Sequence, residues 1–177
     1  MSESDTIAKV KDKQGLLSKI QNFFTGGYSL KEDLRELDKQ LRDLYFRDFR
    51  ELRRKWEEAY LEILETNQRS LNRNFKKVIQ TLDRVSAQIN RSDYGYAGLM
   101  DRKGHIREKE LAKVYDYDRE FGEEIDKLKI SVDTVLEGVE EQEWKSIRKE
   151  VKTIRDILED IEIRWARRED QFRTLEV

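Results

Sequence analysis

The sequence contains no proline and no cysteine among its 177 residues. Because proline removes a backbone donor and breaks helices, its absence permits very long helices. The absence of cysteine excludes disulfides and thiolate metal sites, and it fits a reducing compartment. We therefore expect a cytoplasmic protein.

Long apolar runs are also absent from the sequence. No stretch approaches the roughly 18 residues that are needed to cross a bilayer. The first residues, MSESDTIAKVKDK, lack the basic-then-apolar order of a secretory signal. We expect no membrane span and, at most, a peripheral position at a membrane surface.

Signatures of catalysis and metal binding are absent as well. His105 is the only histidine, which excludes the Glu-x-x-His pairs of two-metal bundles, and we interpret it as an exposed loop residue. The glycines form neither a dinucleotide fingerprint nor a phosphate loop. Carboxylate pairs at helical spacing arise by chance in a chain with 38 acidic residues. The sequence predicts a protein that is not an enzyme, with no catalytic residue, metal ligand or cofactor.

What the sequence does contain is charge and helical periodicity. Charged residues make up 42% and apolar residues 37% of the chain, a balance typical of disordered chains and of long helices alike. Ser29 and Glu32 match a capping box, which predicts the start of a helix. From Leu30, apolar residues recur at spacings of three and four as far as Ile89. This stripe predicts a helix at about residues 29–90.

A polar connection follows the first long helix. Residues 91–105 collect Asn, Ser, Asp and Gly without apolar periodicity, so we expect a loop. Because loops carry binding residues more often than cores do, Tyr94 and Tyr96 are candidate contact residues for a partner.

Two further apolar stripes follow the loop. They predict helices at about residues 106–138 and 141–176, and Asp118 is the one charged residue that interrupts the first stripe. Near Gly138 the phase of the stripe changes. Either the helix continues through a stutter, or it ends at this glycine and a new helix turns back.

Charge predicts which of these helices pair. Residues 69–91 carry six basic side chains and one acidic side chain, whereas residues 110–143 carry twelve acidic and four basic ones. If the chain folds back around residue 98, these two runs lie side by side. The predicted fold is all-α, a long antiparallel helical hairpin like a coiled coil, with a short N-terminal amphipathic helix. If the chain breaks near Asn67 and Gly138, it folds back as a three- to four-helix bundle instead.

The first long helix carries a wide apolar and aromatic zone between residues 44 and 64. This zone is wider than a two-helix seam covers, and aromatic side chains are costly to leave exposed. We expect it to meet either a third helix or another subunit, and we predict a homo-oligomer. The candidate self-association residues are Tyr45, Phe46, Phe49, Trp56 and Tyr60.

An amphipathic segment at residues 15–25 lies in an N-terminal arm, residues 1–28, that a glycine pair separates from the helical body at residues 29–177. Its apolar residues share one face of a short helix, and lysines give the surroundings a positive bias. These features are typical of a helix that binds in the plane of a membrane surface. The same face also suits packing back on the bundle as a cap. The candidate residues for docking on a membrane or partner are Leu16, Leu17, Lys19, Ile20, Phe23 and Phe24.

The order of these segments resembles the PspA and ESCRT-III class of membrane-remodelling proteins. The matching parts are the amphipathic GLLSKIQNFF, the hinge TGG, a helix of about 60 residues from SLKEDLRELDKQL, and an antiparallel return helix. The resemblance covers most of the chain and rests on helix order, without a residue motif. It implies polymerisation through the hairpin and membrane binding through the N-terminal helix.

Two functions are consistent with these features. The first is a non-enzymatic, self-assembling helical scaffold that docks on a membrane surface through residues 15–25. The alternative is a soluble helical-bundle adaptor or assembly subunit in a protein complex, whose N-terminal helix caps its own bundle. A nucleic-acid-associated subunit that uses residues 69–91 is less favoured, because we expect those charges to pair with the acidic run.

Overall fold

The computed structural model describes the backbone of residues 3–26, 31–66, 68–92 and 108–174, and the side chains of residues 11–22, 36–66, 68–92 and 115–168. Within these residues the chain forms helices and no strand, which confirms the all-α prediction. The helices are α1 (Glu3–Gly26), α2 (Lys31–Leu64), α3 (Arg69–Arg91), α5 (Glu108–Glu140) and α6 (Trp144–Thr174).

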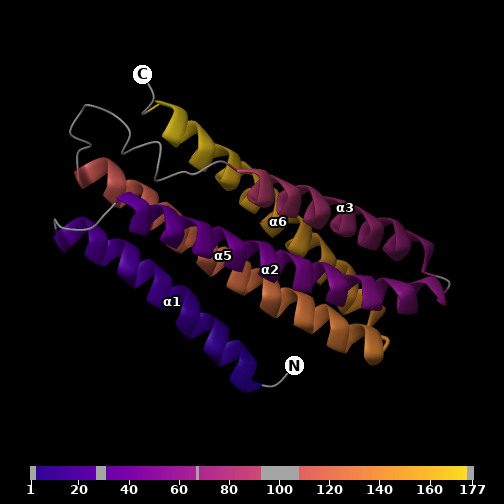
Figure 1. Ribbon diagram of the computed structural model, residues 1–177. Coiled ribbons are helices and arrows are strands. Elements are labelled where there is room, and N and C mark those ends of the chain that lie inside the picture. Colours follow the sequence, from indigo (N-terminus) through magenta and orange to yellow (C-terminus); the bar gives the residue numbers. More distant parts are fainter. Residues whose placement is uncertain (1–2, 27–30, 67, 93–107, 175–177) are drawn as a thin grey trace.

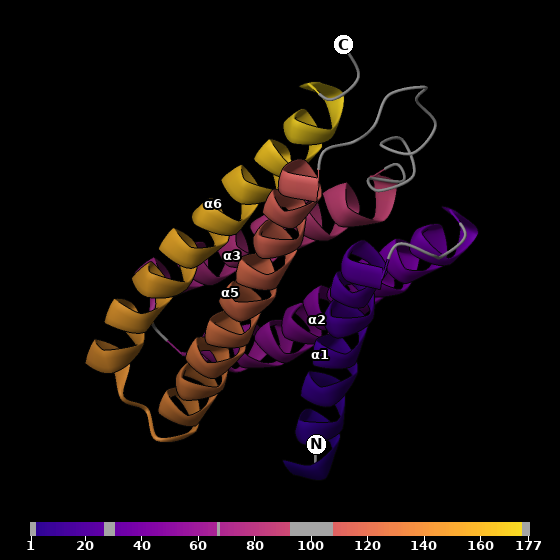
Figure 2. The same ribbon diagram turned by 90° about the vertical axis from the view of Figure 1, so that its left-hand side faces the viewer.

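Two antiparallel hairpins form the body of the molecule. The first joins α2 to α3 and the second joins α5 to α6, with α2 packed beside α5 and α3 beside α6 (Figure 1). Both short turns lie at the same end of the bundle, which we call the turn end. The fifth helix, α1, lies against α2 and α5 outside this four-helix bundle, on the side opposite α6 (Figure 2). The bundle alternative is therefore the one that the structure adopts.

The single helix predicted at residues 29–90 is wrong, because α2 and α3 are separate helices. At the end of α2 the backbone tightens, with the Glu65 amide donating to the Glu62 carbonyl at 3.2 Å. The Thr66 hydroxyl donates to the Ile63 carbonyl at 2.7 Å. A side chain that bonds to its own backbone competes with helix continuation, so the polar residues near Asn67 favour the turn.

The pairing predicted from charge is also wrong. Among the described residues, α3 packs on α2 and α6, and it makes no packing contact with α5. The basic run at residues 69–91 therefore does not lie beside the acidic run at residues 110–143. Both helices present an apolar stripe that many partners could cover, and the four-residue turn after α2 returns α3 along α2 itself.

The aromatic zone of α2 meets other helices of the same chain. Trp56 is fully buried and stacks on Phe75 of α3, with ring centroids 4.3 Å apart. Its indole N–H donates to the Phe75 carbonyl at 3.0 Å. Farther along the bundle, Tyr45 packs edge-on against Phe121 of α5, which in turn contacts Trp165 of α6. The aromatic zone of α2 was expected to meet a third helix or another subunit, and the structure shows it packed against other helices of the same chain.

The turn between α5 and α6 explains both the phase change and the glycine near it. The predicted boundaries at residues 138 and 141 lie within three residues of the observed end of α5 and start of α6. The residue with positive φ is Gln142, at 59°, and not Gly138. Gly138 lies inside α5, where a Cβ would stand 3.1 Å from Cγ1 of Ile147. This glycine therefore allows close packing of the two helices and does not end the first one.

Candidate functional site

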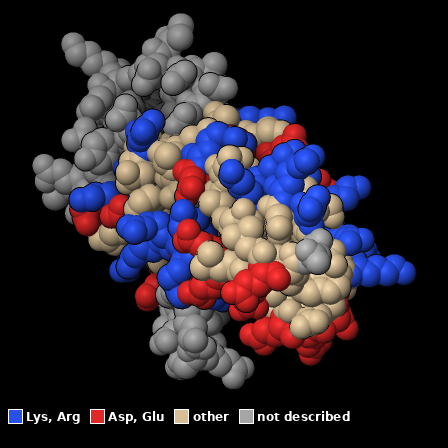
Figure 3. Space-filling view, turned by 90° about the vertical axis from the view of Figure 1, so that its right-hand side faces the viewer, with Lys and Arg blue, Asp and Glu red and all other residues tan. Residues whose placement is uncertain are grey.

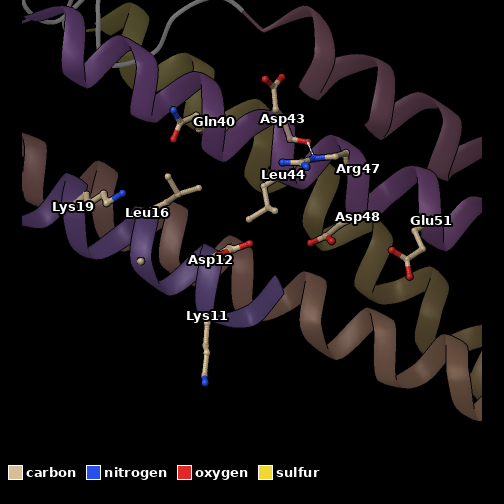
Figure 4. Close-up of a pocket in the computed structure, with 11 residues that line it drawn as sticks. Lys11, Asp12, Leu16, Lys19, Gln40, Asp43, Leu44, Arg47, Asp48 and Glu51 are labelled. Atoms are coloured by element: carbon tan, nitrogen blue, oxygen red, sulfur yellow. Dashed lines mark hydrogen bonds between the residues drawn. The ribbon is translucent and has the colours of Figure 1, made fainter. Parts of the chain in front are cut away.

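The N-terminal helix is held along the groove between α2 and α5. Its residue Ile20 is fully buried and Leu17 is 6% exposed, whereas Leu16 is half-buried and Lys19 is exposed. Figure 4 shows Leu16 and Leu44 facing each other across the space between α1 and α2. Part of the predicted docking face is therefore occupied by the chain's own bundle. The side chains of Phe23 and Phe24 lie outside the described residues.

A buried lysine fixes the position of α1 on α5. The Lys13 ammonium donates to the Gly122 carbonyl at 3.0 Å and pairs with Asp126 at 2.7 Å. Lys13 is only 5% exposed, so its charge depends on these two acceptors for stabilisation. The ionic contacts continue to α2, because Lys129 lies 3.7 Å from Asp126 and 2.8 Å from Asp48. One chain of charges thus links three helices.

The close approach of α1 to α5 depends on a glycine. A Cβ on Gly122 would stand 3.1 Å from Cδ of Lys13 and 3.2 Å from the hydroxyl oxygen of Tyr45. The Tyr45 hydroxyl is itself fixed, since it donates to the Asp118 carbonyl at 2.7 Å. Burial raises the pKa of Tyr45 well above 10, with a further contribution from the nearby Asp118 carboxylate. The hydroxyl therefore stays protonated and keeps its role as a donor.

A shallow groove of about 690 Å³ runs between α1 and α2 (Figure 4). Its lining mixes basic and acidic side chains, and the Arg47 Nε donates to the Asp43 carbonyl at 3.2 Å. Pockets for small molecules are mostly apolar with a few convergent polar groups. Across the described part of the chain, no group of three or more His, Cys, Asp or Glu side chains is arranged to hold a metal ion. The groove therefore gives no support to a cofactor site.

A buried ionic cluster lies at the end of the bundle opposite the turn end. Arg168 of α6 pairs with Asp118 of α5 at 2.7 Å and with Asp38 of α2 at 2.8 Å. Both carboxylates are fully buried, and Arg168 is 2% exposed. Arg42 contacts the other oxygen of Asp38 at 3.1 Å and donates to the Ser92 carbonyl at 2.5 Å. Buried carboxylates are tolerated only with such partners, so the cluster fixes how the helices pair at this end.

The cluster explains why a charged residue interrupts the stripe of α5. Asp118 occupies a core position because a guanidinium from α6 meets it there. Asp38, Arg42 and Arg168 were not among the residues predicted from the sequence. A signal was present, since Asp38 stands among the apolar positions of α2 and Arg168 among those of α6. When charged residues of opposite sign occupy core positions on different helices, they are expected to pair with one another.

The structure separates the predicted self-association residues into two groups. Tyr45, Phe49 and Trp56 are fully buried within one copy of the chain, so in this fold they are not available to a second copy. Phe46 and Tyr60 are half-buried and keep some exposed surface. The predicted loop residues Tyr94 and Tyr96, like His105, lie outside the described residues.

Comparison with known proteins does not assign the chain to a family. No protein-family model, curated protein or solved structure matches the chain. The helix of about 60 residues that supported the resemblance to membrane-remodelling proteins is divided between α2 and α3. Among the described helices, none has an apolar stretch long enough to cross a membrane. The function must therefore be argued from the surfaces of this chain.

Proposed function

We propose that the protein is a non-enzymatic helical-bundle adaptor, an assembly subunit whose N-terminal helix closes its own bundle. The observation that carries this proposal is the burial of Leu17 and Ile20 between α1 and the bundle. Burial of one such side chain stabilises a fold by about 1.5–3 kcal/mol. A helix that docks outward through this face would lose that contribution and the Lys13 ion pair.

Membrane docking through α1 is the second candidate function. One observation supports it: among the described helices, α1 packs only on α2 and α5, while the four-helix bundle is closed by other contacts. Release of α1 would therefore leave the bundle assembled. In this alternative the helix is stored on the bundle and binds a membrane only after release.

A charge reversal distinguishes the two functions. In Lys13→Glu, a carboxylate faces Asp126 and the Gly122 carbonyl, so we expect α1 to detach. The free energy of unfolding should fall by about 1–3 kcal/mol, less than for a fully buried pair because the Asp126 side chain is 37% exposed. Amide hydrogen exchange in α1 should accelerate at least about tenfold. The matched control is Lys19→Glu, the same change at an exposed position of α1, which should alter neither quantity.

Co-sedimentation with vesicles of phosphatidylcholine and phosphatidylglycerol then assigns the function. The adaptor proposal expects neither the native chain nor Lys13→Glu to pellet with vesicles. Pelleting of Lys13→Glu alone would establish membrane docking after release of α1. Pelleting of the native chain would contradict the adaptor proposal directly.

We further propose that copies of the adaptor associate through the C-terminal end of α2. Leu61 and Leu64 are 58% and 48% exposed there, one turn apart, beside the half-buried Tyr60. Neighbouring exposed apolar side chains are typical of interaction surfaces, whereas single ones are common everywhere. Ile130 on α5 is 68% exposed, and it supplies a natural comparison.

The double substitution Leu61→Glu with Leu64→Glu should lower the mass of the assembly to that of one chain. Light scattering coupled to size-exclusion chromatography measures this directly. Ile130→Glu, an equally polar change at another exposed apolar position, should leave the mass unchanged. If the native chain has the mass of a single copy at high concentration, the self-association proposal is wrong.

A further inference from the structure

Two rows of basic side chains lie exposed on neighbouring helices of the bundle. One row is at the start of α3 and the other at the start of α6, and Glu150, half-buried, is the one acidic residue in residues 69–82 and 144–155. Figure 3 shows Lys and Arg side chains gathered over the upper and right-hand parts of the turn end, with Asp and Glu side chains below them. The exposed basic residues are Arg69, Arg73, Lys76, Lys77, Lys145, Arg148, Lys149, Lys152 and Arg155.

The two rows run side by side along α3 and α6. Gln68 accepts a hydrogen bond from Arg148 at 2.8 Å, and Arg84 pairs with Glu162, so residues 78 to 80 positions apart lie opposite each other on α3 and α6. By the same register, basic residues are level with one another over successive turns of the two helices. The level pairs are Arg69 with Lys149, Arg73 with Lys152, and Lys77 with Arg155. We call these six residues the basic ladder.

Within the described residues, no ion pair involves the basic ladder, although ion pairs occur on either side of it. Along α6, the acidic residues Asp156 and Glu159 come one turn after Lys152 and Arg155. Asp83 is bound to Arg53 and Glu162 to Arg84. The acidic run of α5, which was expected to cover these charges, lies diagonally across the bundle. Like charges gathered on one surface repel, and a bound anion would relieve that repulsion.

We propose that the basic ladder binds the phosphate backbone of single-stranded nucleic acid. Three pairs of cations extend over about 12 Å of helix, since each residue advances about 1.5 Å. Such a row suits a chain of phosphates, which binds by releasing its counterions and needs no base recognition. This inference is independent of the proposed adaptor function, because it concerns the face of the bundle opposite α1.

The surroundings of the ladder favour a nucleic acid over a membrane. Among the described residues, the strongly exposed large apolar side chains are Leu61 and Leu64 before the turn to α3, Ile130 on α5 and Ile163 in the second half of α6. The ladder itself therefore has no strongly exposed apolar side chain between its cations to insert among acyl chains. Beside its first pair is an open hollow of about 840 Å³, lined by Trp144, by the basic Lys145, Arg148 and Lys149, and by the acidic Glu143. The half-buried indole of Trp144 gives a base an aromatic surface on which to stack.

The ladder also has a limit at the turn end. Glu140, Glu141 and Glu143 are exposed in the turn that precedes α6. Their charges repel phosphates, so a strand should follow the ladder toward Arg84 and not cross the turn. A short site of this kind holds a few phosphates, which predicts weak binding that depends strongly on salt.

Fluorescence anisotropy of a labelled 20-nucleotide oligo-dT with the full chain tests this proposal. The logarithm of the binding constant should fall linearly with the logarithm of salt concentration, with a slope of about −0.7 for each phosphate contacted. Arg73→Gln with Lys152→Gln, one level pair of the ladder, should reduce that slope by about 1.4. The matched control is Lys39→Gln with Lys127→Gln, which removes two exposed lysines from α2 and α5.

Each outcome of this experiment decides the proposal. It is supported if the ladder variant loses binding while its thermal unfolding temperature is unchanged or higher, as relief of like-charge repulsion predicts. It is overturned if the native chain does not bind the oligonucleotide at 50 mM salt, or if the control variant loses as much as the ladder variant. It is also overturned if phosphatidylglycerol vesicles bind the native chain more tightly than the oligonucleotide does. Dissociation of an oligomer by the ladder variant would overturn it as well, in favour of a second copy as the occupant.

Discussion

Replacement of Arg168 by methionine should lower the free energy of unfolding by about 3–5 kcal/mol, the largest effect expected from a charged residue here. The guanidinium contacts Asp118 at 2.7 Å and Asp38 at 2.8 Å, and both carboxylates are fully buried. It also lies 4.9 Å from the centroid of the Trp165 ring. Methionine keeps much of the side-chain volume, so the loss reports two buried carboxylates deprived of a partner. Urea denaturation followed by circular dichroism measures it.

Two controls show that burial is the cause. Arg164→Met makes the same substitution one turn earlier, where the arginine is 35% exposed and pairs with Glu120 and Glu124, and it should cost less than about 1 kcal/mol. Combining Arg168→Met with Asp118→Leu should restore most of the stability, because it replaces the whole ion pair with apolar side chains. Asp38 keeps Arg42 as its partner in that variant. Equal losses for Arg164→Met and Arg168→Met would contradict the role given to the cluster.

Replacement of Trp56 by alanine should also cost about 3–5 kcal/mol, through loss of buried area and the cavity left behind. The indole is fully buried, stacks on Phe75 at 4.3 Å and donates its N–H to the Phe75 carbonyl at 3.0 Å. Removal of the ring therefore leaves a cavity between α2 and α3 and removes the indole hydrogen bond to the Phe75 carbonyl. Thermal unfolding and urea denaturation both measure the effect.

The same variant tests whether Trp56 acts within one chain or between copies. If the residue belongs to the intramolecular core, the loss of stability should not depend on protein concentration. If it joins two copies, the native chain should become more stable as its concentration rises, and the variant should not. Trp144→Ala is the matched control, a half-buried tryptophan at the turn end that should cost less than half as much. A concentration-dependent difference between Trp56→Ala and the native chain would restore the self-association hypothesis for this residue.

Local sequence determined the helices and several of their ends, but the short N-terminal helix predicted at residues 15–25 is wrong in its start, because α1 begins at Glu3 and ends at Gly26. A chain without proline, with apolar residues at spacings of three and four, has one backbone arrangement that buries its stripes, and the structure is helical as predicted. The polar residues near Asn67 and the phase change near Gly138 marked both short turns. These features are local because they depend on hydrogen bonds and packing within a few residues of the chain. Asp118 was recognised from the sequence only as an interruption of its apolar stripe, and its buried partners were not predicted.

Only the tertiary structure decided which helices pair and which surfaces are left exposed. An apolar stripe can pack against any other stripe, so periodicity does not determine which helix is the partner. The net charge of a helix is also a poor guide to its partner, because exposed ion pairs contribute little energy. Several packing features depend on residues that are far apart in the sequence. They are the close approach of α1 to Gly122, the burial of Ile20, and the contacts of Arg168 with two other helices. The basic run of α3 was visible in the sequence, whereas its exposure beside the basic start of α6 follows from the turn that returns α3 along α2. The sequence by itself determined where the charges are, and the packing of the four helices decided which of them are left without a partner.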